Sequence, residues 1–295
     1  MRGTIVKAIS SFYYVEIEDR IYECRTKGAF KHKNIELAVG DKVDISITDE
    51  ENSKGLIINA FKRRNFMQRP PIANVSQAIL VFSIKSPDPN LSLIDRFIVT
   101  AYSENVDIVI CLNKIDLNTD NILEEIIENY SKTGHPVIPI CAETGYNIDA
   151  VKQYLKGNTT IVAGPSGAGK STLINKLVEN VKLKTGEVSA KIGRGKHTTR
   201  YIELLKIDED SFIADSPGFS SINLDKVEER DLKEYFIEFH EYDVDCKFGN
   251  KCIHENEPGC KVKEAVEEKM ISEKRYESYI QLLNEIREQN KRRNY

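Results

Sequence analysis

The first 66 residues alternate short hydrophobic runs with polar turn signals. β-Branched and aromatic residues cluster or alternate in these runs, and Lys27-Gly28 and Val39-Gly40-Asp41 are typical turns. Several short strands in one small unit favour a β-barrel, and we expect the five-stranded oligonucleotide-binding type. The runs that predict strands cover residues 3–9, 13–17, 20–25 and 42–47.

After the Arg69-Pro70-Pro71 junction, which favours an extended linker, strand and helix patterns alternate. Such alternation predicts a parallel, doubly wound α/β sheet, whose ligands bind at the carboxyl ends of the strands. The expected strands cover residues 78–84, 106–112, 136–140, 159–162, 201–207 and 211–214, and the expected helices cover 91–102, 122–130, 148–155 and the segment after 170.

From about residue 224 onward the apolar positions follow helical spacing. A helix is expected over 227–240, and 262–295 carries a rough apolar stripe. The patterns together predict a multidomain chain. Its parts are an oligonucleotide-binding-type barrel over 1–66, a central α/β domain over 67–223 and a C-terminal helical domain over 224–295.

A phosphate-binding loop follows the predicted strand 159–162. The loop fits G-x-x-x-x-G-K-[ST] at every fixed position and opens a helix, so its backbone N–H groups and the helix dipole can bind phosphate. Lys170 should reach the β- and γ-phosphates, and the Ser171 hydroxyl should ligate Mg²⁺. The alternative is a chance glycine turn before a core helix. The nucleotide-binding residues expected here are Gly164, Pro165, Ser166, Gly167, Ala168, Gly169, Lys170, Ser171 and Thr172.

A second nucleotide motif, Asn113-Lys114-Ile115-Asp116, ends the predicted strand 106–112. The Asp116 carboxylate can accept hydrogen bonds from the ring N–H and the amine of guanine, a pair that adenine lacks. Asn113 can serve the opposite edge or tie loops together, and Lys114 can lay its stem over the base. Alone, the tetrapeptide could be a surface turn. Cys141 and Ala142 follow the next strand, where a backbone N–H could meet the guanine oxygen.

A small, basic, hydroxyl-rich segment, residues 193–200, has the composition of a nucleotide-sensing switch. Thr198 or Thr199 could complete the Mg²⁺ shell, with Thr199 preferred, or the segment could be a loop with no direct role. Asp215-Ser-Pro-Gly218 then ends a strand, which places Asp215 on the Mg²⁺ side through water and the Gly218 N–H at the γ-phosphate.

The order of these motifs differs from that of most GTPases. The guanine-reading motif at 113–116 precedes the phosphate loop at 164–171, and Asp215 to Gly218 comes last. This order predicts a circularly permuted GTPase domain, which is possible where the original chain ends lie close together. The segment that senses the γ-phosphate then leads directly into the C-terminal domain.

A Cys-x5-Cys-x-His-x5-Cys knuckle lies in the C-terminal domain. Three thiols and one imidazole supply the four ligands of a closed, structural Zn²⁺ site, although reduced thiols without metal are the alternative. The proposed zinc ligands are Cys246, Cys252, His254 and Cys260. The remaining cysteines, Cys24, Cys111 and Cys141, lie in strand-like runs that favour small core residues.

Amino-acid composition and charge narrow the class of protein that the sequence can encode. The 295 residues are 40% hydrophobic and 30% charged with a net charge of −4, which is typical of a globular chain and gives no global signal of nucleic-acid binding. Lys27, Lys31, His32 and Lys33 surround Phe30 and could hold RNA or form a solvated loop. No run approaches about 18 apolar residues and no hydrophobic signal region precedes the barrel, so we expect a soluble, cytoplasmic protein.

The combination resembles the ribosome small subunit-dependent GTPase A family. The likeness covers the barrel, the Arg69-Pro70 junction, the permuted motif order, Gly-Arg-Gly-Lys-His-Thr-Thr, Asp-Ser-Pro-Gly-Phe and the knuckle. It implies a bacterial GTPase that uses GTP/GDP, Mg²⁺ and one structural Zn²⁺. It further implies late maturation of the small (30S) ribosomal subunit, contact with 16S rRNA, and action as a monomer without a membrane.

The hydrolysis chemistry lacks one usual residue. Many GTPases place glutamine after Asp-x-x-Gly to orient water, but Phe219 stands here. His197 is the candidate that similar proteins suggest, so Lys170, Gly218 and His197 form the predicted catalytic set. One alternative is an RNA-binding assembly factor with a passive nucleotide switch, which Phe219 favours. Another is a metabolic kinase, which Asn113 and Asp116 argue against.

Overall fold

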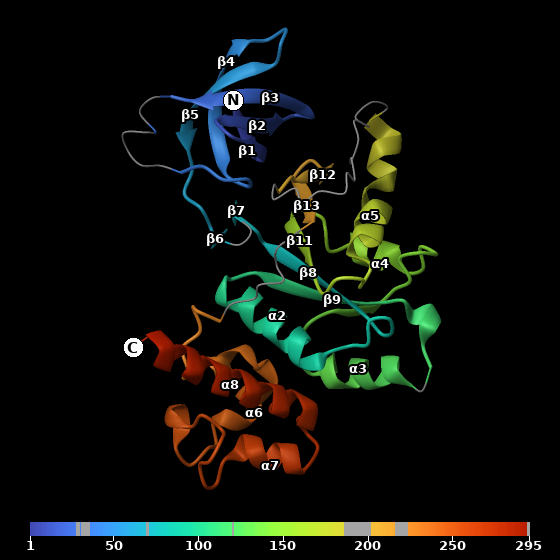
Figure 1. Ribbon diagram of the computed structural model, residues 1–295, viewed down its shortest axis with the longest axis vertical. Coiled ribbons are helices and arrows are strands. Elements are labelled where there is room, and N and C mark those ends of the chain that lie inside the picture. Colours follow the sequence, from blue (N-terminus) through green and yellow to red (C-terminus); the bar gives the residue numbers. More distant parts are fainter. Residues whose placement is uncertain are drawn as a thin grey trace. The chain divides into compact units, whose positions relative to one another are not determined.

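The computed structural model describes residues 1–27, 30, 36–68, 71–119, 121–185, 202–215 and 224–293, with the backbone alone for 179–185, 215 and 293 (Figure 1). The chain divides into two compact units. The first comprises Met1–Ile79, Ala142–Ala163 and Lys170–Ser221, and the second comprises Leu80–Cys141, Gly164–Gly169 and Ile222–Tyr295. The domain boundaries predicted from the sequence stay a prediction.

The N-terminal strands form the expected closed five-stranded barrel. Its order is β1-β2-β3-β5-β4, and β3 and β5 are parallel while the other pairs are antiparallel. Closure pairs both edges, and fully buried Ile5, Val15 and Ile57 help to fill the interior. The strands are β1 (Arg2–Ile9), β2 (Phe12–Ile17), β3 (Arg20–Thr26), β4 (Lys42–Asp49) and β5 (Lys54–Ala60).

Two details of the barrel differ from the expectation. The predicted strands do not include β5, because three consecutive apolar residues, Leu56, Ile57 and Ile58, hide the alternation of buried and exposed positions that this strand has. Phe30 is 6% exposed and packs in the barrel core, so it is not a stacking platform for a base. Lys31, His32 and Lys33 lie outside the described residues.

A six-stranded sheet carries the two nucleotide motifs at its strand ends. Its order is β10-β9-β8-β11-β13-β12. The pairs β10–β9 and β11–β13 are parallel as predicted, while β12 runs antiparallel to β13 at the edge. The strands are β8 (Gln77–Ser83), β9 (Asp107–Asn113), β10 (Val137–Pro139), β11 (Thr159–Ala163), β12 (Leu205–Asp208) and β13 (Ser211–Asp215).

Helices connect these strands as the periodicity predicted, except that the helix expected over 148–155 ends at Lys152. Every residue of β8 is buried, as expected of a central strand covered on both faces. A short hairpin precedes β8, formed by β6 (Phe66–Gln68) and β7 (Pro71–Ala73). The helical elements are α2 (Leu91–Ser103), the 3₁₀ helix η1 (Ile115–Leu117), α3 (Ile122–Ser131), α4 (Ile148–Lys152) and α5 (Lys170–Thr185).

Within the first unit, the edge of the sheet is joined to the barrel. The Leu204 N–H donates to the Val6 carbonyl at 2.8 Å. The Lys206 ammonium nitrogen lies 2.5 Å from a carboxylate oxygen of Glu16 and 2.7 Å from one of Asp19. The Lys7 ammonium nitrogen lies 3.1 Å from a carboxylate oxygen of Glu203. The barrel is therefore bonded to the strand that leads, through β13, to Asp215.

The C-terminal part is helical, but one predicted helix is wrong. Residues 227–240 form turns and two 3₁₀ helices, because Phe236 leaves the helical region at φ −107° and ψ 80°. This break lets the rings of Phe236 and Phe239 stack in the core, with their centroids 5.2 Å apart. The elements are η2 (Leu232–Tyr235), η3 (Ile237–Phe239), α6 (His240–Asp243), η4 (Gly249–Lys251), α7 (Lys261–Glu267) and α8 (Glu273–Arg293). Among the described helices, none combines the length and apolar character needed to cross a bilayer.

Candidate nucleotide and metal sites

The phosphate loop has the backbone that its glycines permit. Gly164, Gly167 and Gly169 have φ angles of 142°, 79° and 94°, which L side chains rarely adopt. A Cβ atom on Gly164 would lie 2.1 Å from the Val81 carbonyl oxygen, so glycine allows the loop to pass close to β8. Helix α5 begins at Lys170, which puts the first-turn N–H groups of Lys170, Ser171 and Thr172 directly after the loop.

Asn113 joins the guanine-reading motif to the phosphate loop. Its side chain is 3% exposed, and its Nδ2 donates to the Ala168 carbonyl at 2.8 Å. A Cβ on Gly169 would lie 2.2 Å from the same Nδ2, so only glycine leaves room for this contact. Two roles were considered for Asn113. The structure shows the one in which its side chain ties two loops together.

The Asp116 carboxylate lies exposed on η1 and is held by Cys141, which follows shortly after β10. The Cys141 thiol, buried at 4% exposure, donates to Asp116 Oδ1 at 3.0 Å. The Ile140 N–H bonds to the Leu112 carbonyl at 2.8 Å, which explains why the ends of β9 and β10 lie together. Cys141 is thus both a buried residue and a contact of the Asp116 carboxylate.

The structure also describes the other residues that were expected to bind the nucleotide near these strand ends. Lys114 has a left-handed backbone, with φ 63°, and its Nζ donates to the Ser86 carbonyl. Ala142 is fully buried directly after Cys141. Pro165 is half-buried, whereas Ser166 and Gly167 are exposed at the turn of the loop.

Several predicted residues cannot be placed. His197, Thr198, Thr199, Gly218 and Phe219 lie outside the described residues, and only the backbone of Asp215 is described, at the end of β13. The magnesium set Ser171, Thr199 and Asp215 and the catalytic set with His197 therefore stay predictions.

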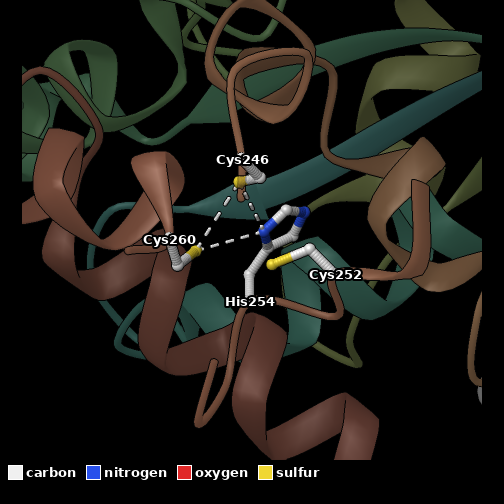
Figure 2. Close-up of side chains that lie close together, drawn as sticks. All are labelled: Cys246, Cys252, His254 and Cys260. Carbon is white, nitrogen blue, oxygen red and sulfur yellow. Dashed lines mark hydrogen bonds between the residues drawn. The ribbon is translucent and has the colours of Figure 1, made fainter. Parts of the chain in front are cut away.

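The four knuckle residues converge as predicted (Figure 2). All four are buried, and their ligand atoms lie within 4.8 Å of one another. His254 Nδ1 lies 3.3 Å from Cys260 Sγ and 3.8 Å from Cys246 Sγ, and these two sulfurs are 4.0 Å apart. Ligands of a tetrahedral zinc ion are separated by about 3.8 Å, so the donors fit that ion.

Without a bound cation, burial determines whether the cysteine thiols and the histidine of the knuckle carry a proton. It raises the pKa of the Cys252 thiol to about 12 and raises that of Cys260 as well, while it lowers the pKa of His254. The imidazole is therefore held in its neutral, metal-binding form. The buried thiols need a nearby cation to exist as thiolates, and a bound metal ion would supply it.

Tyrosines of α8 anchor the knuckle loop and were missed in the sequence. Tyr276 donates to the His254 carbonyl at 2.7 Å, and Tyr279 donates to the Ile253 carbonyl at 2.6 Å. In the sequence Tyr276 belongs to the apolar stripe expected over 262–295, which gives no sign of its hydroxyl contact, and Tyr279 is not part of that prediction. Asp243 and Lys233, which lie close to His254, were also missed, because they belong to no recognisable motif.

The chain matches two family models. Residues 2–57 match the RsgA N-terminal domain, and residues 60–225 match the RsgA GTPase. The small ribosomal subunit biogenesis GTPase RsgA of Alkaliphilus metalliredigens is 45% identical over 286 residues, which cover 97% of this chain and 98% of that protein.

Solved structures give the same result. YjeQ from Thermotoga maritima has a TM-score of 0.82 and 36% identity, covering 97% of this chain and 98% of that one. YloQ, described as a circularly permuted GTPase, has a TM-score of 0.82 and 30% identity, covering 98% and 95%. With matching barrel, permuted motif order and whole-chain similarity, this chain belongs to the RsgA GTPase family.

Proposed function

We propose that this chain binds the small ribosomal subunit through 16S rRNA, acts in its late maturation and hydrolyses GTP to GDP and phosphate when bound there. Membership of a GTPase family implies GTP or GDP and Mg²⁺ as ligands. The name of the Alkaliphilus relative supports a small-subunit partner. The proposal includes a monomer acting in the cytoplasm, where bacterial subunits are assembled.

The contact of Asp116 with Cys141 carries the GTP assignment. The thiol holds one carboxylate oxygen at 3.0 Å in a fixed orientation, and Asn113 connects the same motif to the phosphate loop. A carboxylate held this way can accept both donors of the guanine edge, which disfavours adenine nucleotides. Recognition of the base and of the phosphates is thereby coupled through one buried amide.

The remaining residues have distinct proposed roles. Backbone N–H groups of the phosphate loop and Lys170 bind the phosphates, and Ser171, Thr199 and Asp215 hold Mg²⁺, which neutralises charge on the phosphate oxygens. The Gly218 N–H detects the γ-phosphate. His197 orients the attacking water, since Phe219 has no group that can do so.

Purified small subunits are expected to raise GTP hydrolysis by more than about tenfold, because ordering a water-positioning group removes at least ~1.4 kcal/mol from the barrier. Phosphate release is measured with GTP or ATP, with small or large subunits. His197→Ala should lose the stimulation and keep GTP binding, whereas His240→Ala, at a side chain 47% exposed on α6, should keep both.

Two results would contradict the proposed stimulation of GTP hydrolysis by the small subunit. Equal stimulation by large subunits or with ATP would contradict the proposed partner and nucleotide. Tight GTP binding with no stimulation would favour the passive nucleotide switch, the alternative that Phe219 supports.

We further propose that the knuckle holds a single structural Zn²⁺ ion. Four protein ligands leave no open position, so the ion would brace the fold and take no part in hydrolysis. Burial of all four donors and their mutual distances support this.

Removal of zinc is expected to unfold the knuckle while the barrel stays intact. The free energy of zinc binding by small knuckles is about 10–16 kcal/mol near neutral pH, and here it would be lost to a chelator. Hydrogen exchange of residues 244–261 should accelerate strongly in chelated protein, and that of β1 to β5 should not change. Unchanged exchange in the knuckle, or no zinc in purified protein by mass spectrometry, would contradict the proposal.

A further inference from the structure

A buried polar chain adjoins the knuckle on the side of His254 that faces away from the sulfurs. His254 is 0% exposed, and its Nε2 lies 3.2 Å from Asp243 Oδ1 at the end of α6. Both atoms are buried, and among the described side chains neither completes a hydrogen bond. Leaving two such atoms unsatisfied is costly, whereas a proton on Nε2 directed at the carboxylate would satisfy both.

Lys233 fixes the orientation of this carboxylate. The Lys233 side chain is 6% exposed, and its Nζ donates to Asp243 Oδ2 at 2.7 Å and to the Asn250 carbonyl at 3.4 Å. With Oδ2 occupied by the ammonium group, Oδ1 is the oxygen turned toward the imidazole. Asn250 belongs to η4 inside the knuckle, so Lys233 also contacts the metal-binding loop itself.

Only one tautomer of the His254 imidazole suits the groups that face its two ring nitrogens. Nδ1 faces the sulfurs of Cys246 and Cys260, and Nε2 faces Asp243. A metal ligand nitrogen must carry no proton, so the proton must be on Nε2. Metal-bound histidines commonly donate their other ring N–H to a carboxylate, which fixes the tautomer and increases the basicity of the ligand.

We propose that Asp243, held in place by Lys233, fixes His254 as the Nε2–H tautomer and thereby presents Nδ1 to the metal ion. Asp243 is a positioning residue, because it acts through His254 and does not touch the ion. This inference rests on the proposal that the knuckle holds Zn²⁺. It adds two residues outside the Cys-x5-Cys-x-His-x5-Cys pattern to the requirements of the site.

The test compares zinc affinity in the full-length wild-type chain and in variants, by competition with a chromophoric chelator. Asp243→Ala is expected to bind zinc about 10–100-fold more weakly. Asp243→Asn keeps one acceptor oxygen but sets its amide NH2 against either the Lys233 ammonium group or the His254 Nε2–H, so it should recover only a small part of this loss. Lys233→Met should show an intermediate loss. Asp245→Asn, at an exposed carboxylate beside Cys246 in the same loop, is the matched control and should bind zinc like the wild type.

Two spectroscopic readouts separate positioning from a general effect on folding. Long-range ¹H–¹⁵N spectra of the zinc-loaded chain should show the His254 proton on Nε2 in the wild type. The Co²⁺-substituted chain should show the same visible bands for wild type and Asp245→Asn, and shifted bands for Asp243→Ala. Equal zinc affinity of Asp243→Ala and Asp245→Asn, or a wild-type proton on Nδ1, would overturn the inference while leaving the zinc proposal intact. A wild-type chain that takes up neither Zn²⁺ nor Co²⁺ would overturn both.

Discussion

Asp116→Asn is expected to weaken GTP binding about 10²–10⁴-fold and to favour xanthine nucleotides instead. The Asp116 carboxylate offers two acceptor oxygens to the two donors of guanine, and each charge-assisted hydrogen bond is worth about 1.5–3 kcal/mol. An asparagine amide replaces one acceptor by a donor. Xanthine carries a carbonyl where guanine carries its amine, so the amide pairs with xanthine and repels guanine.

Fluorescent GDP, XDP and ADP analogues would measure this exchange. Asp107→Asn is the matched control, because Asp107 is exposed at the opposite end of β9 and should leave all three affinities unchanged. Cys141→Ala should weaken GDP binding more mildly, since it removes only the thiol that orients Asp116 at 3.0 Å. If Asp116→Asn still preferred GDP over XDP, Asp116 would not read the base.

Arg275→Met is expected to destabilise the second unit by about 3–5 kcal/mol. Arg275 is 2% exposed and bonds to Asp95, which is 0% exposed, and to Glu238 through Nε at 2.6 Å and an amino nitrogen at 3.0 Å. Its guanidinium also lies 4.5 Å from the Phe236 ring centroid. Removing this one cation leaves two buried carboxylates unpaired, which is among the largest costs that a single substitution can have.

Urea unfolding followed by far-UV circular dichroism would measure the loss. Arg96→Met is the matched control: Arg96 also joins α2 to α8, through Glu285, but these side chains are 20% and 30% exposed, so less than about 1 kcal/mol should be lost. Combining Arg275→Met with Asp95→Leu and Glu238→Leu should restore much of the stability, because no charge then remains unpaired. Equal losses for Arg275→Met and Arg96→Met would contradict this explanation.

The sequence alone determined the parts whose signals are local. The phosphate loop, the Asn113 to Asp116 tetrapeptide and the four knuckle residues are each defined by residue types at short, fixed spacing, because nests, strand ends and tetrahedral sites impose that spacing on adjacent residues. The order of the motifs along the chain revealed the permutation without any coordinates. Several short strand runs in one small unit predicted the barrel, and the alternation of strand and helix patterns predicted the α/β sheet.

Only the tertiary structure decided how distant residues meet. The sequence allowed Asn113 to tie loops together, but it did not name the Ala168 carbonyl as the partner or Cys141 as a donor to Asp116, since pairs 55 and 25 residues apart are joined by sheet packing. The predicted helix over 227–240 failed because stacking of Phe236 in the core outweighed its local helical spacing.

The partners of buried charges were equally hidden. Arg275 and Asp95 are 180 residues apart, and on two separate amphipathic helices they look like ordinary polar positions. Asp243 and Lys233 carry no motif beside the knuckle. Local spacing therefore specifies which groups can do chemistry, while the packing of distant elements selects the neighbours that hold those groups in place, because burial and hydrogen-bond satisfaction are properties of the folded whole.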